Sequence, residues 1–301
     1  MKRYWLGIAA IAAMSACSGG NPFVEDTDTD PGKDGTGIPE QLAGDLTGFT
    51  YDPDNQTLIV RGISLDDTPF EAVYTRKPGL DVPGYEGYSS QESSLGRHTT
   101  AYVRQIDGTR AAITVSGGQF GHFFGGSAYG RSGAYTPPDT AVAGGIVAYA
   151  GTYVGLLNSP GDGGDLLPVA PGTPLDVRPY QAAEVTGNIL VSADFADNSV
   201  DGLVYNRVHA DSGTAIENLE LWPAKITDTG TFTNDVRQNG GSDTVGVYGG
   251  IFGGPDARAV AGSLYAKDHI SAATDPEEYG LFVLHQCGTA GADPICNQPR
   301  P

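Results

Sequence analysis

The chain has 301 residues, among them 44 glycines and 20 prolines, and its formal charge at neutral pH is −19. Such an acidic surface repels phosphate backbones, which argues against nucleic acid as a partner, and it is not attracted to anionic lipid head groups. The many turn-forming residues, beside 15 tyrosines and 10 phenylalanines, favour an all-β protein with tight turns rather than a disordered one.

The N-terminus has the layout of an export signal over residues 1–16. Lys2-Arg3 precede an apolar run, Leu6 to Met14, that is too short to span a bilayer. The sequence Met14-Ser15-Ala16-Cys17 resembles the lipobox of bacterial lipoproteins, which implies cleavage before Cys17 and acylation of its thiol. The alternative is an ordinary signal peptide that contains a cysteine. The serine that follows the cysteine implies release to the outer membrane, with the protein anchored by its lipid at the cell surface.

Residues 17–43 are predicted to form an acylated, flexible, acidic tether. The alternating carboxylates of Asp26-Thr27-Asp28-Thr29-Asp30 are reminiscent of part of a calcium loop. The glycine and the distal glutamate of such a loop are missing, so a solvated linker is the preferred interpretation.

Residues 44–135 are predicted to form a smaller β-rich region. Two short apolar runs, 49–51 and 58–60, flank the turn sequence Asp52-Pro53-Asp54-Asn55 and indicate a hairpin. Further strands are expected at 70–75, 100–105 and 111–116, with Asp107-Gly108 as the turn between the last two. The glycine-rich stretch 120–135 fits either a loop or an irregular strand.

The segment 140–286 is more regular and is predicted to be a β-barrel domain. Its connections are mostly short and turn-like, so successive strands should be antiparallel, and eight such strands can close into an up-and-down barrel. Residues 275–278 could open a single helical turn. The eight expected strands are 145–156, 183–195, 199–206, 217–226, 230–236, 244–252, 258–265 and 279–285.

Two further cysteines, Cys287 and Cys296, lie in the tail 287–301. With Cys17 acylated they form an even pair in an oxidising compartment, so a disulfide that staples the chain end is expected. Metal binding is the competing interpretation, but neither a CxxC spacing nor a nearby group of histidines supports it.

One stretch of the predicted barrel, residues 249–264, resembles the barrel domain of the transferrin-binding protein B-like surface lipoproteins. The residues that match that family's strand–turn–strand motif are Phe252, Gly254, Pro255, Ala257 and Gly262. The family's acidic residue after the alanine is replaced by Arg258. The resemblance implies a β-rich handle before the barrel. The motif itself is structural: a turn at the glycine–proline pair, a phenylalanine that plugs the barrel and a glycine that permits close strand approach. Because one barrel is present rather than two lobes, transferrin binding is not implied.

No metal-binding HExxH, nucleophile-elbow or phosphate-loop motif occurs in the sequence, and the five histidines are widely spaced, so we expect no enzyme. His122 lies beside two phenylalanines and is followed by Tyr129, and imidazole and phenolate can both ligate haem iron. The alternative is that His122 is an ordinary loop residue, and no cofactor is predicted.

Three functions follow from these observations. The favoured one is a monomeric surface lipoprotein that binds a host protein, another extracellular protein or a small ligand. The second is a haem or metal scavenger, and the third is a structural envelope lipoprotein.

Overall fold

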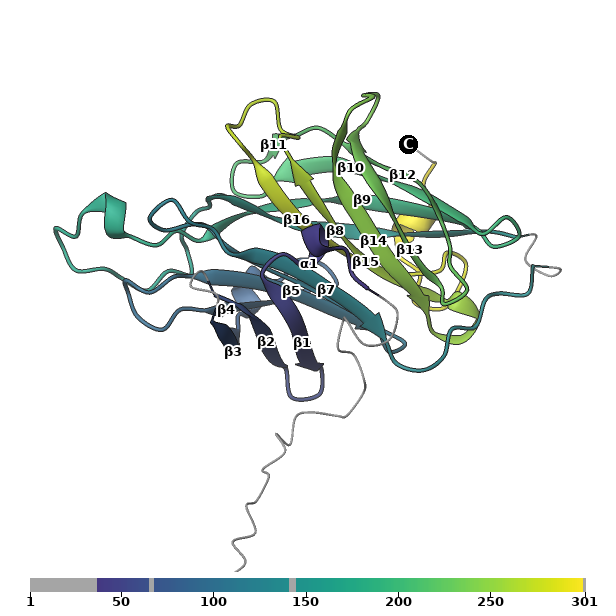
Figure 1. The fold of residues 1–301 in the computed structure, drawn as a ribbon, viewed down its shortest axis with the longest axis horizontal. Helices are drawn as coiled ribbons and strands as arrows, with labels where there is room; N and C mark the ends of the chain where they lie inside the picture. Colours follow the sequence, from purple (N-terminus) through teal and green to yellow (C-terminus); the bar gives the residue numbers. More distant parts are fainter. Residues whose placement is uncertain (1–36, 65–67, 141–144, 300–301) are drawn as a thin grey trace, which may run out of the picture.

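A computed structural model describes residues 37–64, 68–140 and 145–299 of the protein (Figure 1). The signal peptide, Cys17 and the acidic run lie outside these residues. The fold is all-β, as predicted, and consists of a seven-stranded sheet followed by a closed barrel. Within the described ranges, no helix has the length and apolarity needed to cross a membrane.

The first sheet is an antiparallel meander in which every strand pairs with the next along the chain. The predicted hairpins are present, and the stretch left open by the sequence contains a strand, β7. The short strand β4 was not predicted. The strands are β1 (Leu46–Asp52), β2 (Thr57–Ile63), β3 (Pro69–Arg76), β4 (Glu86–Ser90), β5 (Thr99–Ile106), β6 (Thr109–Ser116) and β7 (Gly125–Arg131).

The chain enters the fold before residue 44, because residues 40–43, the last of the segment predicted to be a flexible tether, form a short helix instead. The short helix α1 (Glu40–Ala43) buries Leu42 completely, and Ile38 packs against the same hydrophobic cluster. The carbonyl of Leu42 accepts a hydrogen bond from Ser127, whose hydroxyl also lies 2.7 Å from that of Ser263 in the barrel. Apolar packing by Leu42 and Ile38, together with the hydrogen bond from Ser127, therefore anchors the entering segment where the two sheets meet.

The barrel confirms all eight predicted strands, and its first strand pairs with its last, which leaves no long open edge. A two-residue strand, β11, is an addition that pairs with the end of β10. Residues 277 and 278 begin a strand rather than a helical turn. The strands are β8 (Ile146–Pro160), β9 (Ala182–Asp194), β10 (Ser199–His209), β11 (Thr214–Ala215), β12 (Leu219–Lys225), β13 (Thr231–Gln238), β14 (Thr244–Gly253), β15 (Ala259–Lys267) and β16 (Glu277–His285).

One end of the barrel is filled by aromatic rings around Phe252, which is fully buried. Its ring centroid lies 5.5 Å from that of Tyr149, 5.0 Å from Phe195 and 5.1 Å from Phe232. These rings come from four different strands or strand ends, so they tie the barrel wall together across its interior. The phenylalanine of the motif therefore lies at the centre of the aromatic rings that fill this end of the barrel.

The rest of the motif shapes the β14–β15 connection. Gly254 has a φ of 70°, which a side chain would strain, and Pro255–Ala257 form a 3-10 turn. A Cβ at Gly262 would lie 2.3 Å from the ring of Phe282 and 2.4 Å from the carbonyl oxygen of Gly249. Only glycine therefore fits where β15 passes β14 under a buried ring.

The first sheet packs against the outer face of β14, β15 and β16, as Figure 1 shows. Tyr129 on β7 is buried there, in the same hydrophobic cluster as Leu281 and Val283 of β16. Behind the barrel wall, Cys287 and Cys296 form the predicted disulfide, and the tail ends in a short 3-10 helix, η4 (Pro294–Asn297).

Candidate functional site

Among residues 37–64, 68–140 and 145–299, most of the exposed large hydrophobic side chains lie on three loops at one end of the molecule. They are the β4–β5 loop (91–98), the β6–β7 loop (117–124) and the long β8–β9 connection (161–181), which projects at the left of Figure 1. We call this set the loop surface. Phe120 is 64% exposed and Leu175 is 67% exposed. Of the nine exposed large hydrophobic residues in the part of the chain that the structure describes, six lie here: Leu95, Phe120, Phe123, Leu167, Leu175 and Tyr180.

Buried Gln119 fastens the three loops to one another. Its side-chain amide donates to the carbonyl of Leu95, at 2.9 Å, and to that of Val177, at 3.0 Å. The backbone N–H of Tyr180 donates to the carbonyl of Gly118 at 3.1 Å. The apolar side chains therefore stand on loops held in one arrangement by buried polar contacts.

A second fastening point is Asp165, in the β8–β9 connection. Its carboxylate lies 2.7 Å from the ammonium of Lys77 and 3.0 Å from Nε2 of His98, and it accepts a hydrogen bond from Ser89. Burial alone would raise the pKa of Asp165, but the hydrogen bonds from these partners outweigh it and hold the pKa below its usual range. Burial lowers the pKa of His98, so at neutral pH a neutral imidazole donates to an ionised carboxylate.

Ser89, His98 and Asp165 are the residue types of a hydrolytic triad, but they contact one another in a different arrangement. Serine and histidine both contact the aspartate, whereas a nucleophile must give its proton to the histidine. The arrangement therefore attaches the β8–β9 connection to the first sheet and does not activate Ser89.

At the loop surface, the positive charges are engaged within the protein, whereas the negative charges are open to a partner. Arg97 donates to the carbonyl of His122 at 2.9 Å, and Arg178 donates to that of Thr173 at 2.6 Å, so both cations are engaged by carbonyls of the loop surface itself. Three carboxylates in the same loops are exposed: Glu92, Asp162 and Asp176. An approaching molecule therefore meets apolar side chains among negative charges.

The structure separates the two residues that the sequence suggested for haem or metal. His122 is exposed in the β6–β7 loop, between two exposed phenylalanines, and so belongs to the loop surface. Tyr129 is buried against the barrel, where desolvation raises its pKa and disfavours the phenolate. The part of the chain that the structure describes contains no group of three histidine, cysteine or acidic residues that could hold a metal ion.

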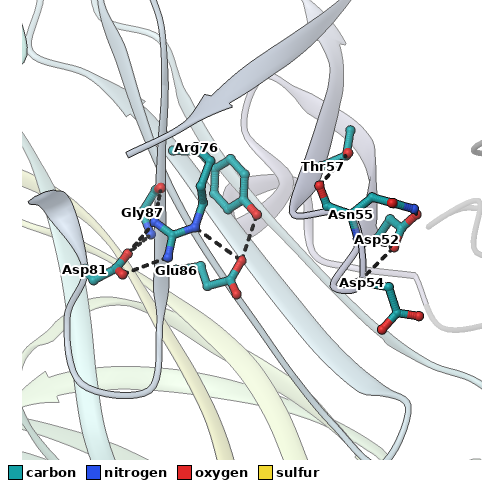
Figure 2. Close-up of polar contacts among 9 residues, drawn as sticks. Asp52, Asp54, Asn55, Thr57, Arg76, Asp81, Glu86 and Gly87 are labelled. Carbon is teal, nitrogen blue, oxygen red and sulfur yellow. Dashed lines mark hydrogen bonds and ion pairs between the residues drawn. The ribbon is translucent and has the colours of Figure 1, made fainter. Parts of the chain in front are cut away.

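A polar cluster on the first sheet, drawn in Figure 2, is held together by contacts among its own members. Arg76 makes two contacts with Asp81, at 2.6 and 2.7 Å, and lies 3.6 Å from Glu86, which also accepts from Tyr88 at 2.7 Å. On the neighbouring hairpin, Asp52 accepts hydrogen bonds across its own turn. These groups fix strand ends and turns, so they leave little capacity for a ligand.

Only the comparison with solved structures finds proteins that are similar to this chain. No family model matches the chain, and no curated protein matches it. A search of solved structures finds two mutants of one protein from Haemophilus parasuis Hp5, at 12% and 11% identity, with TM-scores of 0.39 and 0.38. Each of these two matches covers 79% of this chain. An isotype 1 structure from serogroup B Neisseria meningitidis is 13% identical over 86% of this chain, with a TM-score of 0.36.

All three structures are of transferrin-binding protein B. This is the protein whose family the motif of residues 249–264 resembles. The matches cover 52%, 53% and 55% of those chains, so this chain corresponds to about half of their length.

Proposed function

We propose that the protein is a lipid-anchored binding module of the bacterial cell surface that captures an extracellular protein through the loop surface. The observation that carries the proposal is the gathering of six exposed apolar side chains on three loops that Gln119 and Asp165 hold in place. The lipobox at Cys17 and the family motif of the barrel support the anchor and the class of protein.

An exposed apolar surface costs free energy in water and recovers it when a partner covers the surface. Contiguous apolar patches on soluble monomers are uncommon and mark interaction sites, because water penalises them until a partner covers them. Loops that are already fastened lose little conformational freedom on binding, so more of the contact energy appears as affinity. The position of Phe120 and Phe123 at the tip of one such loop suits them as anchors in pockets of a partner.

The charges suggest which partner fits. The chain is acidic overall, and the exposed ions of the loop surface are carboxylates. A protein with lysines or arginines around an apolar patch would be attracted over a distance and complemented at the rim. Haem capture is the weaker candidate because Tyr129, the second ligand that the sequence suggested, is buried, whereas His122 is exposed.

The test uses the full mature chain without acyl groups, immobilised and presented with host serum and secretions. A Phe120→Ser/Phe123→Ser/Leu175→Ser variant should lose the captured protein, with affinity falling about a hundredfold or more if two of the three act as binding anchors. Val73→Ser is the matched control, because Val73 is 65% exposed on β3, outside the loop surface. Equal capture by both variants would contradict the proposal.

The anchor is tested separately in cells. Metabolic labelling with palmitate should mark the protein, Cys17→Ser should abolish the label, and protease added to intact cells should remove the folded part. An unlabelled protein, or one protected from protease, would contradict the surface assignment while leaving the binding test intact.

A further inference from the structure

The barrel closes between its first and last strands, β8 and β16, and this ladder is parted in its middle. Four pairs join the two strands at one end, from Glu278↔Leu157 to Leu281↔Val154. Pairing is then interrupted until an isolated bridge between Tyr149 and Gln286. The neighbouring β15–β16 ladder runs through nine consecutive pairs without a break. We call the stretch 150–153 with 282–285 the seam.

The register is the same on both sides of the seam, so Val283 stands opposite Thr152. In an antiparallel pair, these two residues would face each other across the ladder. Here the carbonyl of Thr152 and the N–H of Val283 are both bonded to a side chain of the other sheet. The strands are therefore held apart rather than frayed.

That side chain is Tyr85, which precedes β4 in the first sheet. Its hydroxyl donates to the carbonyl oxygen of Thr152 at 2.7 Å and accepts from the N–H of Val283 at 3.2 Å. Tyr85 is 2% exposed, and the guanidinium of Arg104 lies over its ring, 5.2 Å from the centroid. One phenol thus replaces a direct strand-to-strand hydrogen bond in the barrel wall.

We propose that Tyr85 is a clasp through which the first sheet controls the opening of the barrel at this seam. Backbone groups buried in a parted ladder are costly unless they find a partner, and here the partner belongs to the other sheet. Whatever displaces the first sheet from the barrel therefore removes the seam's own hydrogen bonds, whereas the other barrel ladders keep theirs.

The parts of the chain that flank the seam connect it to the loop surface rather than to the rest of the barrel. Tyr85 leads into β4 and then into the β4–β5 loop, and β8 leads into the long β8–β9 connection. Both loops belong to the loop surface. On the other side, the N–H of Cys287 donates to the carbonyl of Ala148 at 2.8 Å, so the stapled tail secures the end of the seam. A partner that displaces the loop surface would therefore disturb the hydrogen bonds of the seam before those of β10, β12 or β13.

Hydrogen exchange on the full mature chain tests the proposal without any ligand, so its result is independent of the binding experiment. Tyr85→Phe keeps the ring but removes the hydroxyl. Amides of 281–286 and 150–154 should exchange about tenfold faster or more, while those of the β9–β10 ladder stay unchanged. Tyr129→Phe is the control, since Tyr129 is another buried tyrosine of the same interface.

The unsubstituted protein provides a second measurement. Its seam amides should open before the β9–β10 amides as denaturant is added, because their protection depends on the contact between the sheets. Unchanged seam exchange in Tyr85→Phe, an equal rise over the whole barrel, or simultaneous opening of both ladders in the unsubstituted protein would each overturn the proposal.

Discussion

A buried ionic cluster inside the barrel gives the sharpest prediction about stability. Glu278 is fully buried at the end opposite the aromatic plug, and its carboxylate lies 2.5 Å from the guanidinium of Arg207. It also accepts from the hydroxyl of Tyr153 at 2.5 Å and lies 2.9 Å from Nε2 of His269. Glu278→Gln keeps the size of the side chain but leaves the Arg207 cation unpaired in the interior.

Two estimates of the loss agree. Removing one partner of a buried ion pair destabilises a protein by about 3–5 kcal/mol. Burial alone would raise the pKa of Glu278, but the charge of Arg207 and the hydrogen bonds from His269 and Tyr153 lower it to about 2, from an ordinary 4.5. A shift of that size corresponds to about 3 kcal/mol of folding free energy.

Urea unfolding followed by the fluorescence of Trp222 measures the effect; the other tryptophan of the sequence, Trp5, lies in the predicted signal peptide. Because the folded pKa lies below the unfolded one, the contribution of Glu278 is present above pH 4.5 and is lost as the pH falls towards 2. Glu278→Gln should be less stable than the unsubstituted chain at pH 7, and the two should converge in acid. A difference below about 1 kcal/mol at pH 7 would refute the reasoning.

Three other predictions concern separate parts of the fold. Burial, and then the nearby Asp211 and Asp162, raise the pKa of Glu184 to about 7, so the free energy of unfolding should fall as the pH rises from 4.5 through 7. Glu184→Gln should flatten this part of a plot of melting temperature against pH, and an unchanged plot would contradict the assignment. Phe252→Ala should cost about 3–5 kcal/mol in a denaturant titration, because it empties the centre of the aromatic plug, and a loss typical of a surface site would show that the rings repack. Reducing the disulfide between Cys287 and Cys296 should cost about 2–3 kcal/mol by loop-entropy arguments; equal melting temperatures with and without reductant would show that the staple contributes little.

The local parts of the fold could be predicted because their signals are local. Strand-forming runs and the turn sequences between them, such as 52–55 and 107–108 in the first sheet and 253–256 in the barrel, depend only on near neighbours. Signals of this kind located all eight barrel strands. Strand β4 was missed because its three central residues are all buried, so its five residues show no alternation. Glu277 and Glu278 suggested a helical turn because their acidic side chains suit one; pairing with β15 makes them strand instead.

The candidate site was only partly visible in the sequence. The aromatic residues around His122 indicated a binding loop, but they suggested haem because Tyr129 lies close to them in the chain. The structure places Tyr129 in the interface between the sheets, and through Gln119 it joins the loop of the phenylalanines to the loops that carry Leu95 and Leu175. The residues that hold these loops, Gln119 and Asp165, carry no motif, since their partners lie on other loops and strands.

The sequence by itself determined the class of fold, the strands of the barrel, the plug of the motif and the pair of cysteines at the chain end. Each of these depends on the periodicity of one segment or on the chemistry of a few adjacent residues. Only the tertiary structure decided where the loop surface lies, that Arg207 and Glu278 meet inside the barrel, and that Tyr85 holds the seam. Those contacts join residues 24 to 198 positions apart along the chain, and nothing in the local sequence encodes which distant groups a closed sheet will bring together.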